Sequence, residues 1–291
     1  MREKARKKWI GGFLLLFFLL SCALSAGAAR LSQKAKAKPD GIVVPIMMYH
    51  EVKPFKTRKD VITPYEMESD LKYLKENGYT TITMTNLVDY AGGKGELPEK
   101  PIVLSFDDGY LNNYIYVLPL LKKYDAKIVL SIIGKNTDDF TRIPDKNLDY
   151  SHVTWGQINE MVETGRVEIQ NHTYNLHLIT RKRYGCQKNK GESEEHYEQV
   201  LTEDIGGLQK EITAATGSTP NTFTYPYGQV SPESYPVIKR LGFKASLTCD
   251  YGVNLITRNP QVLYGLKRVC RVHGVPIQKA LQSVMKTLRY R

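Results

Sequence analysis

The sequence predicts an α/β protein whose main domain is a regular or distorted (β/α) barrel of about seven or eight units. Three observations predict it. From residue 43 onward, short β-rich runs alternate with helical patterns. The length of 291 residues can supply one large domain of this kind, or alternatively two small ones. No glycine-rich phosphate loop follows any β-rich run, which disfavours a doubly wound open sheet, the alternative α/β architecture.

The β-rich runs are the predicted strands, because they concentrate apolar, β-branched and aromatic residues. In chain order they cover residues 44–49, 80–84, 101–106, 127–133, 167–170, 222–225, 243–248 and 263–269.

Helical patterns fill most of the intervals, over residues 65–77, 112–124, 154–164, 194–216, 232–241 and 275–288. Thr63-Pro64 before the first helix and Gly78 after it are start and stop signals. The longest helix has an apolar stripe that we expect to pack in the core, namely Tyr197, Val200, Leu201, Ile205, Leu208 and Ile212. Residues 178–193, rich in Arg, Lys and Gly, are predicted to form a mobile loop beside the site.

Basic residues are concentrated at the N-terminus. Residues 1–39 contain nine Lys or Arg and one Glu, so this segment carries +8 of the net charge of +11. The high pI is therefore mostly a property of this segment, and no nucleic-acid role is expected.

Residues 1–29 are predicted to be a signal peptide or an N-terminal membrane anchor. Five basic residues precede an uncharged stretch from Trp9 to Ala29, which is long enough to span a membrane. Ala26-Gly27-Ala28 suits cleavage, and Leu19-Leu20-Ser21-Cys22 loosely resembles a lipobox, so secretion, an uncleaved anchor and a lipoprotein all stay open. We expect a basic linker over residues 30–42 and a domain over 43–291 that lies outside the cytoplasm.

Two adjacent carboxylates end an apolar run in the segment Ser105-Phe106-Asp107-Asp108-Gly109. Neighbouring side chains of a strand point to opposite faces, so two acids in a row belong where the chain turns. There both can face one site, with Gly109 allowing the turn. A plain Asp-Asp-Gly turn is the alternative.

Two histidines follow another predicted strand, His172 two residues after the end of residues 167–170 and His177 five residues later. On a helix these positions would diverge by about 140°, but a strand end and a turn can bring them together. Two imidazoles and one carboxylate of the Asp107-Asp108 pair would make a three-ligand site with open positions. The sequence therefore predicts a hydrolytic metal centre.

Three motifs in this order resemble those of the polysaccharide deacetylases, the NodB-homology or carbohydrate esterase 4 family, over roughly residues 43–275. They are the Asp107-Asp108 segment, the segment from His172 to His177, and Phe223-Thr224-Tyr225-Pro226-Tyr227-Gly228. The resemblance implies removal of N-acetyl groups from N-acetylglucosamine units of an extracellular or cell-wall polysaccharide. The longer histidine spacing is similar to that of biofilm poly-N-acetylglucosamine deacetylases, while peptidoglycan and chitin oligomers remain open.

The resemblance also implies a role for each site residue. Asp108, His172 and His177 would hold a divalent metal, zinc first, with cobalt, nickel or iron as alternatives. Asp107 would be the general base and His50, at the end of the first strand, the general acid. Tyr227 would supply an oxyanion-binding N–H, with Pro226 and Tyr225 beside the substrate. Tyr110, Trp155, Tyr184 and Tyr225 could stack on sugars, although packing is the commoner role of aromatic residues.

Two departures from the family pattern keep alternatives open. Thr224 stands where many members have an arginine that steadies the base, and Leu266-Lys267-Arg268 lacks the histidine of a Leu-x-His motif. His273 lies just beyond that strand, and His50 could instead be a structural histidine. The two departures are compatible with a catalytically weakened carbohydrate-binding protein of the same fold. The basic N-terminal segment is compatible with an envelope protein that binds anionic polymers. His152 and His196 are given no role.

Overall fold

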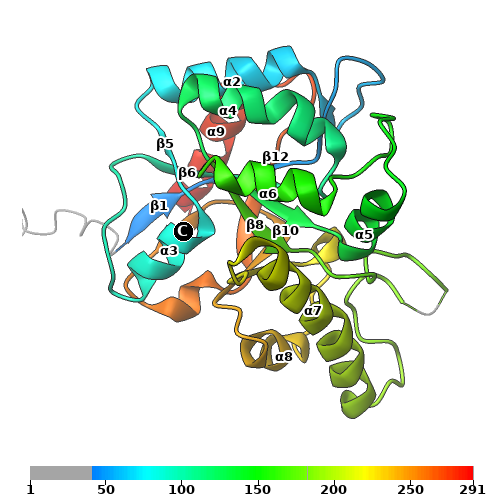
Figure 1. Ribbon diagram of the computed structural model, residues 1–291. Coiled ribbons are helices and arrows are strands. Elements are labelled where there is room, and N and C mark those ends of the chain that lie inside the picture. The colour runs from blue at the N-terminus through cyan, green and yellow to red at the C-terminus, as the bar shows by residue number, and fades with distance from the viewer. Residues whose placement is uncertain (1–40, 182, 291) are drawn as a thin grey trace, which may run out of the picture. The chain divides into compact units, whose positions relative to one another are not determined.

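Seven parallel strands close into a barrel in the computed structural model, which describes residues 41–181 and 183–290 (Figure 1). The ring runs through β2 (Ile46–Tyr49), β12 (Leu266–Cys270), β10 (Ala245–Tyr251), β9 (Thr222–Thr224), β8 (Val167–Asn171), β7 (Ile128–Ile132) and β6 (Pro101–Phe106). Strand β6 pairs again with β2, with Met47 opposite Leu104, and this pairing closes the ring. The predicted barrel is confirmed.

Short strands lie outside this ring. Strand β5 (Thr80–Thr81) pairs with the first two residues of β6. Strand β1 (Ile42–Val44) pairs antiparallel with β11 (Asn254–Ile256), and β3 (Glu51–Val52) pairs with β4 (Val61–Ile62).

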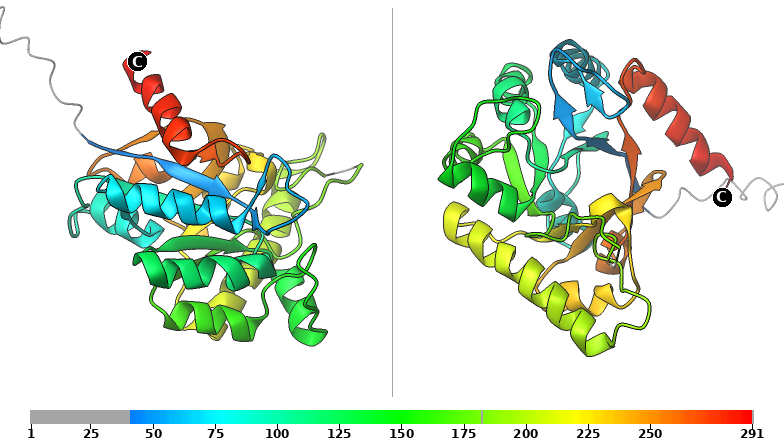
Figure 2. Two further views of the ribbon diagram at one scale, coloured as in Figure 1. Left: turned by 90° about the horizontal axis from the view of Figure 1, so that it is seen from above. Right: turned by 90° about the vertical axis from the view of Figure 1, so that its right-hand side faces the viewer.

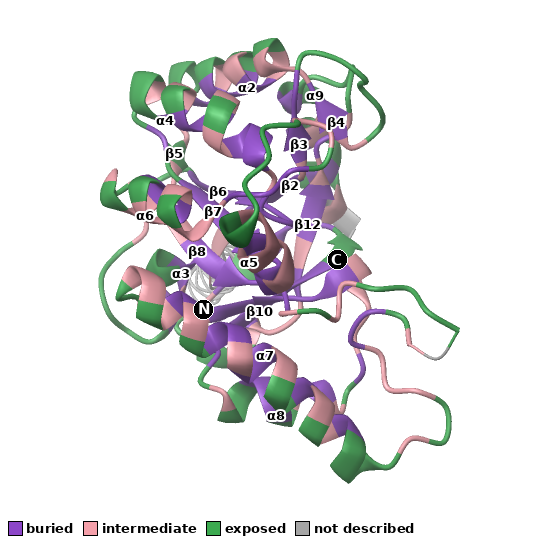
Figure 3. Ribbon diagram, turned by 45° about the vertical axis from the view of Figure 1, so that its right-hand side comes forward, coloured by how far each residue is buried: buried purple, intermediate pink, exposed green. Residues whose placement is uncertain are grey.

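Helices surround the strands, as the views in Figure 2 show. They are α2 (Pro64–Glu76), α3 (Met84–Ala91), α4 (Leu118–Tyr124), α5 (Gly134–Arg142), α6 (Trp155–Glu163), α7 (Glu194–Thr216), α8 (Ser234–Arg240) and α9 (Ile277–Lys286). Short π or 3-10 turns cover Asn113–Val117, Pro226–Gly228, Pro260–Leu263 and Thr287–Tyr290. The strands are largely buried, and the outer faces of the helices are exposed (Figure 3).

Local signals explain where the helices begin and end. Helix α2 starts with a capping box in which Thr63 and Glu66 satisfy each other's backbone N–H groups. Helix α7 is capped by Ser193 and ends at Gly217, which has a left-handed conformation. The apolar stripe of α7 is buried apart from Val200, as expected for core packing.

Two helices, α3 and α5, were not predicted, and several strands are shorter than predicted, β5 most of all. The chain leaves β5 early because the Thr83 side chain accepts the N–H of Asn86 and so caps α3. Helix α5 is mostly polar and buries only Gly134 and Thr137, which explains why it lacks a clear apolar stripe in the sequence.

Parallel strands bring their carboxyl ends to one rim of the barrel, where the candidate site residues follow β2, β6, β8 and β9. Over residues 41–181 and 183–290, no helix has the length and apolarity needed to cross a membrane. The predicted signal or anchor, residues 1–29, and residues 30–40 of the linker lie outside the described residues. The cysteines that the structure describes, Cys186, Cys249 and Cys270, are free thiols.

Candidate active site

Three side chains that were predicted to hold a metal converge at the carboxyl-terminal rim of the barrel. Asp108 lies two residues beyond β6, His172 directly follows β8, and His177 lies on the next turn. The Nε2 atom of each histidine is 3.4 Å from Oδ1 of Asp108, and the three candidate ligand atoms lie within 4.8 Å of one another. Asp108 and His172 are buried, whereas the side chain of His177 is 19% exposed. The cluster is thus accessible from the side of His177.

The Oδ1 atom of Asp108 gives an independent indication that these residues fit a cation. It is buried and has no hydrogen-bond partner among the described residues. A buried carboxylate oxygen is costly when nothing compensates its charge. Asp108 also has a left-handed backbone conformation (φ 72°) and is followed by Gly109 (φ 79°), so the turn itself is constrained. A divalent cation held between Asp108 and the two histidines would compensate this oxygen.

The protonation of the two histidines also suits a metal. The Nδ1 atom of His172 is 2.7 Å from the carbonyl oxygen of Thr224. A carbonyl can only accept, so Nδ1 carries a proton, and in the neutral ring the Nε2 lone pair then faces Asp108. Burial and then the neighbouring His172 lower the pKa of His177 to about 4, so its ring is neutral at pH 7. Neutral imidazoles and an ionised carboxylate form a usual donor set for zinc.

The pKa values of Asp108 and His172 depend on the contact between these two side chains. Burial acts to raise the pKa of Asp108, but the two histidines hold it well below its ordinary value. Burial acts to lower the pKa of His172, but Asp108 and Asp107 raise it overall. A bound cation would reverse this rise, because its charge opposes a proton on the ring.

Asp107 is held by an arginine to which the sequence analysis gave no role. Nη1 of Arg268, on β12, donates to Oδ1 of Asp107 at 2.7 Å and to Oγ of Ser105 at 3.0 Å. Arg268 is 1% exposed and Asp107 is 2% exposed. Burial acts to raise the pKa of Asp107, but Arg268, His172 and His50 together lower it below its ordinary value. Asp107 is therefore ionised at neutral pH.

Thr224 has other partners. Its hydroxyl bonds to that of Ser131 at 2.7 Å, and its carbonyl accepts the proton of His172. The guanidinium beside the candidate base thus comes from β12, on the other side of β10, and not from the third motif. Only its burial in β12 distinguishes Arg268 from the neighbouring Lys267, and burial is seen in the structure and not in the sequence.

His50 lies beside the same carboxylate. Its Nε2 is 4.0 Å from Oδ2 of Asp107, and its side chain is 24% exposed. The carbonyl of His50 accepts a hydrogen bond from Nδ2 of Asn113 at 3.1 Å, which ties the end of β2 to the segment after β6. His50 therefore lies beside Asp107 with part of its side chain exposed to solvent.

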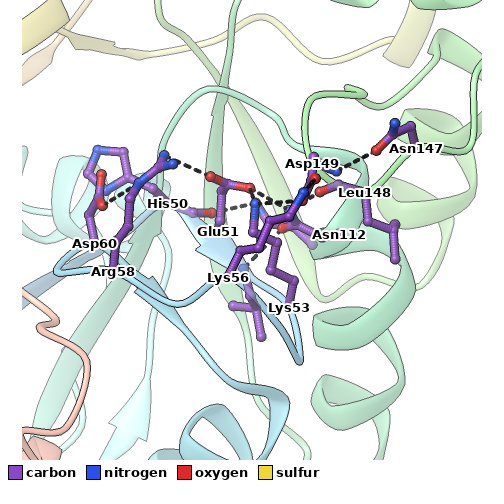
Figure 4. Close-up of polar contacts among 12 residues, drawn as sticks. His50, Glu51, Lys53, Lys56, Arg58, Asp60, Asn112, Asn147, Leu148 and Asp149 are labelled. Carbon is purple, nitrogen blue, oxygen red and sulfur yellow. Dashed lines mark hydrogen bonds and ion pairs between the residues drawn. The ribbon is translucent and has the colours of Figure 1, made fainter.

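A buried polar cluster fixes the backbone that follows His50 (Figure 4). The carboxylate of Glu51, 1% exposed, accepts from Lys53 at 2.7 Å, Arg58 at 2.9 Å and Asn112 at 3.2 Å. Asn112 also accepts the N–H of Val52 at 3.0 Å. The sequence gives no signal for this cluster, because Asn112 is far in the chain from residues 51–58.

The remaining histidines lie in other surroundings. Nδ1 of His273 is 2.7 Å from a carboxylate oxygen of Glu66 at the start of α2. His152 stacks on Tyr110 with ring centroids 4.7 Å apart, and His196 pairs with Glu192. The structure brings His50, and not His273, to Asp107.

The third motif contributes one tyrosine to the core and another to the site. Tyr225 is fully buried and its hydroxyl bonds to Ser234 at 2.6 Å, so it is a core residue that cannot stack on a sugar. Pro226 is buried, and Tyr227 follows in a left-handed conformation (φ 56°). The Tyr227 ring lies 4.3 Å from that of His177 and 5.1 Å from that of Tyr184, centroid to centroid. Tyr184 comes from the loop predicted to lie beside the site.

Residues 94–246 match the model of a family described as polysaccharide deacetylase. Poly-beta-1,6-N-acetyl-D-glucosamine N-deacetylase of Escherichia coli K12 is 23% identical over 237 residues, which are 75% of this chain and 35% of that protein. The protein of the same name from Staphylococcus aureus N315 is 27% identical over 189 residues, 65% of this chain and 61% of that one. The chain thus spans about a third of the first relative and less than two thirds of the second.

A solved structure is similar over most of its length. A de-N-acetylase from Aggregatibacter actinomycetemcomitans is 29% identical, with a TM-score of 0.66, and the match covers 78% of this chain and 94% of that one. The family model covers more than half of the 291 residues and includes the strand ends that carry Asp107, Asp108, His172 and His177. The chain therefore belongs to the polysaccharide deacetylase family.

Proposed function

We propose that this protein is a metal-dependent hydrolase that removes N-acetyl groups from N-acetylglucosamine units of an extracellular or cell-wall polysaccharide. One observation carries the proposal, namely that the Asp108–His172–His177 cluster, the Asp107–Arg268 pair and His50 share one rim of the barrel. The names of the relatives favour poly-N-acetylglucosamine as the polymer.

Asp108, His172 and His177 would hold the metal, zinc first, with cobalt, nickel or iron as alternatives. When bound, a divalent cation polarises the acetamide carbonyl and makes a water molecule more acidic.

The chain's own residues supply the proton transfers. Asp107, kept ionised by Arg268, accepts the proton of the attacking water as general base. The N–H of Tyr227 donates to the oxygen on which negative charge develops. His50, on the open side of Asp107, donates a proton to the departing sugar nitrogen. The C–N bond breaks, and the products are acetate and a glucosamine unit.

A carbohydrate-binding protein with weakened catalysis is the alternative. Its support is the absence of two family features, the arginine of the third motif and the histidine of the Leu-x-His motif. Arg268 supplies a guanidinium to Asp107 at 2.7 Å, which favours the enzyme over the binding protein.

Acetate release by the purified protein tests the proposed function. Poly-N-acetylglucosamine, chitin oligomers and peptidoglycan serve as substrates, with and without a chelator. We expect chelator-sensitive release, fastest with poly-N-acetylglucosamine. Binding of these polymers without acetate release, after loading with each of the four metals, would favour the alternative.

His50→Ala should lower turnover by about 10²-fold or more with no loss of metal, because it removes the proton donor to the leaving group. His273→Ala is the matched control and should have a mild effect, since His273 is bonded to Glu66 and is 38% exposed. Steady-state acetate release and elemental analysis of both variants provide the measurement. An essential His273 with a dispensable His50 would show that the acid is wrongly assigned.

We also propose that residues 43–291 lie outside the cytoplasm, either anchored to the membrane or secreted. The five basic residues before Trp9 support this orientation. Protease added to intact cells should degrade any cell-associated domain, and deletion of residues 1–39 should give a soluble, active protein. Protection of the domain in sealed cells, with shielding by a cell wall excluded, would place it in the cytoplasm.

A further inference from the structure

The turn between His172 and His177 has a conformation that its sequence does not favour. Thr173 is β-branched and fully buried, and its φ is 75°. β-Branched residues rarely adopt this left-handed region, so neighbouring groups must hold the turn in place.

Much of that support comes from adjoining segments. The N–H of Thr173 donates to Oδ1 of Asn171 at 2.9 Å, and its carbonyl accepts the N–H of Gly134 at 3.1 Å. The carbonyl of Tyr174 accepts the N–H of Lys135 at 2.9 Å. These bonds fix the first part of the turn against the start of α5.

The second part of the turn is held by one carboxylate of α7. Oδ1 of Asp204 accepts the N–H of Tyr174 and Oδ2 accepts the N–H of Asn175, both at 2.8 Å. Each oxygen thus binds one of two successive backbone groups. Burial raises the pKa of Asp204 to about 6 although both bonds act to lower it. The two hydrogen bonds therefore offset only part of the cost of burying this carboxylate.

His177 depends on this turn more than His172 does. His172 is fixed by β8, since its N–H donates to the carbonyl of Ile132 at 3.0 Å and its ring is bound to Thr224. His177 lies two residues beyond Asn175, and its carbonyl accepts a longer hydrogen bond, 3.3 Å, from the hydroxyl of Tyr227. A displaced turn would therefore move His177 away from Asp108 while leaving His172 in place.

We propose that Asp204 is a positioning residue, which sets the affinity of the Asp108–His172–His177 cluster for a divalent metal by holding the turn that presents His177. This inference rests on the metal site of the proposed function. It concerns how tightly the site binds and not which reaction follows.

The chain offers a matched control in Glu168. Its carboxylate also accepts two successive backbone N–H groups, those of Met84 at 2.9 Å and Thr85 at 3.1 Å. These groups lie at the start of α3, while Glu168 is near the beginning of β8 and His172 follows the end of that strand. Glu168→Ala thus removes the same type of contact, together with a hydrogen bond from Nε2 of Gln170 at 2.9 Å, without touching the turn from Thr173 to His177.

Zinc affinity of the purified full chain, measured by competition with a chromogenic chelator, tests the proposal. Asp204→Ala should bind zinc about 10- to 100-fold more weakly than the wild type. Asp204→Asn keeps one acceptor oxygen and should have an intermediate affinity, and Glu168→Ala should bind like the wild type. Thermal melting shows which variants fold, and if Asp204→Ala does not fold, the Asn variant decides.

Three results would overturn the inference. In the first, folded Asp204 variants bind zinc like the wild type, which leaves the proposed function intact. In the second, Glu168→Ala loses as much affinity as Asp204→Ala, which indicates general loosening of the barrel. In the third, the wild-type chain binds no zinc, cobalt, nickel or iron, which removes the metal site of the proposed function as well.

Discussion

Replacing Asp108 or His172 with alanine should abolish both the bound metal and acetate release. Each variant keeps only two of the three proposed ligands, because alanine has no side-chain atom that can bind a metal. Because His172 also bonds to Thr224, its loss further frees the strand end that orients the site. Elemental analysis of the purified variants measures the metal, and released acetate measures turnover.

His196→Ala is the matched histidine control for this experiment. Its imidazole is exposed on α7, pairs with Glu192 and lies outside the cluster, so metal content and activity should both be retained. Full metal occupancy in Asp108→Ala and His172→Ala would show that other residues hold the metal.

The strand-end argument predicted the centre of this site because it depends on local sequence. Asp107-Asp108 and His172 directly follow continuous β-rich runs, and parallel strands bring such ends to one rim. His177 could be placed near His172 because only a short turn separates them. These inferences require the fold class but no knowledge of side-chain packing.

Arg268 could not be assigned in this way. It is 161 residues from Asp107 in sequence, and it meets that carboxylate only because β12 and β6 both flank β2 in the closed ring. Within the sequence, Lys267-Arg268 resembles any basic pair on a strand, and only burial distinguishes the two side chains. Helix α5 was missed for a related reason, since its few buried residues are recognised as such only against the neighbouring elements.

Asp107→Asn should lower turnover by about 10²-fold or more while the metal stays bound. The amide keeps the shape of the side chain and can still accept from Arg268, but it cannot take a proton from water. Asp108 and both histidines are unchanged, so metal content should equal that of the wild type. Acetate release at saturating polymer, together with elemental analysis, measures the two effects separately.

Arg268→Met provides a second test of the same base. With the guanidinium removed, burial is opposed only by the histidines, so the pKa of Asp107 should rise. A base works in its deprotonated form, and the acidic limb of the kcat/KM profile should therefore move to higher pH.

Breaking this buried pair also costs about 3–5 kcal/mol of stability, so the profile is measured well below the melting temperature of the variant. Arg268→Lys, which keeps the charge, should shift the limb less. An unchanged acidic limb in a folded Arg268→Met variant, or normal turnover by Asp107→Asn, would assign the proton transfer to a different group.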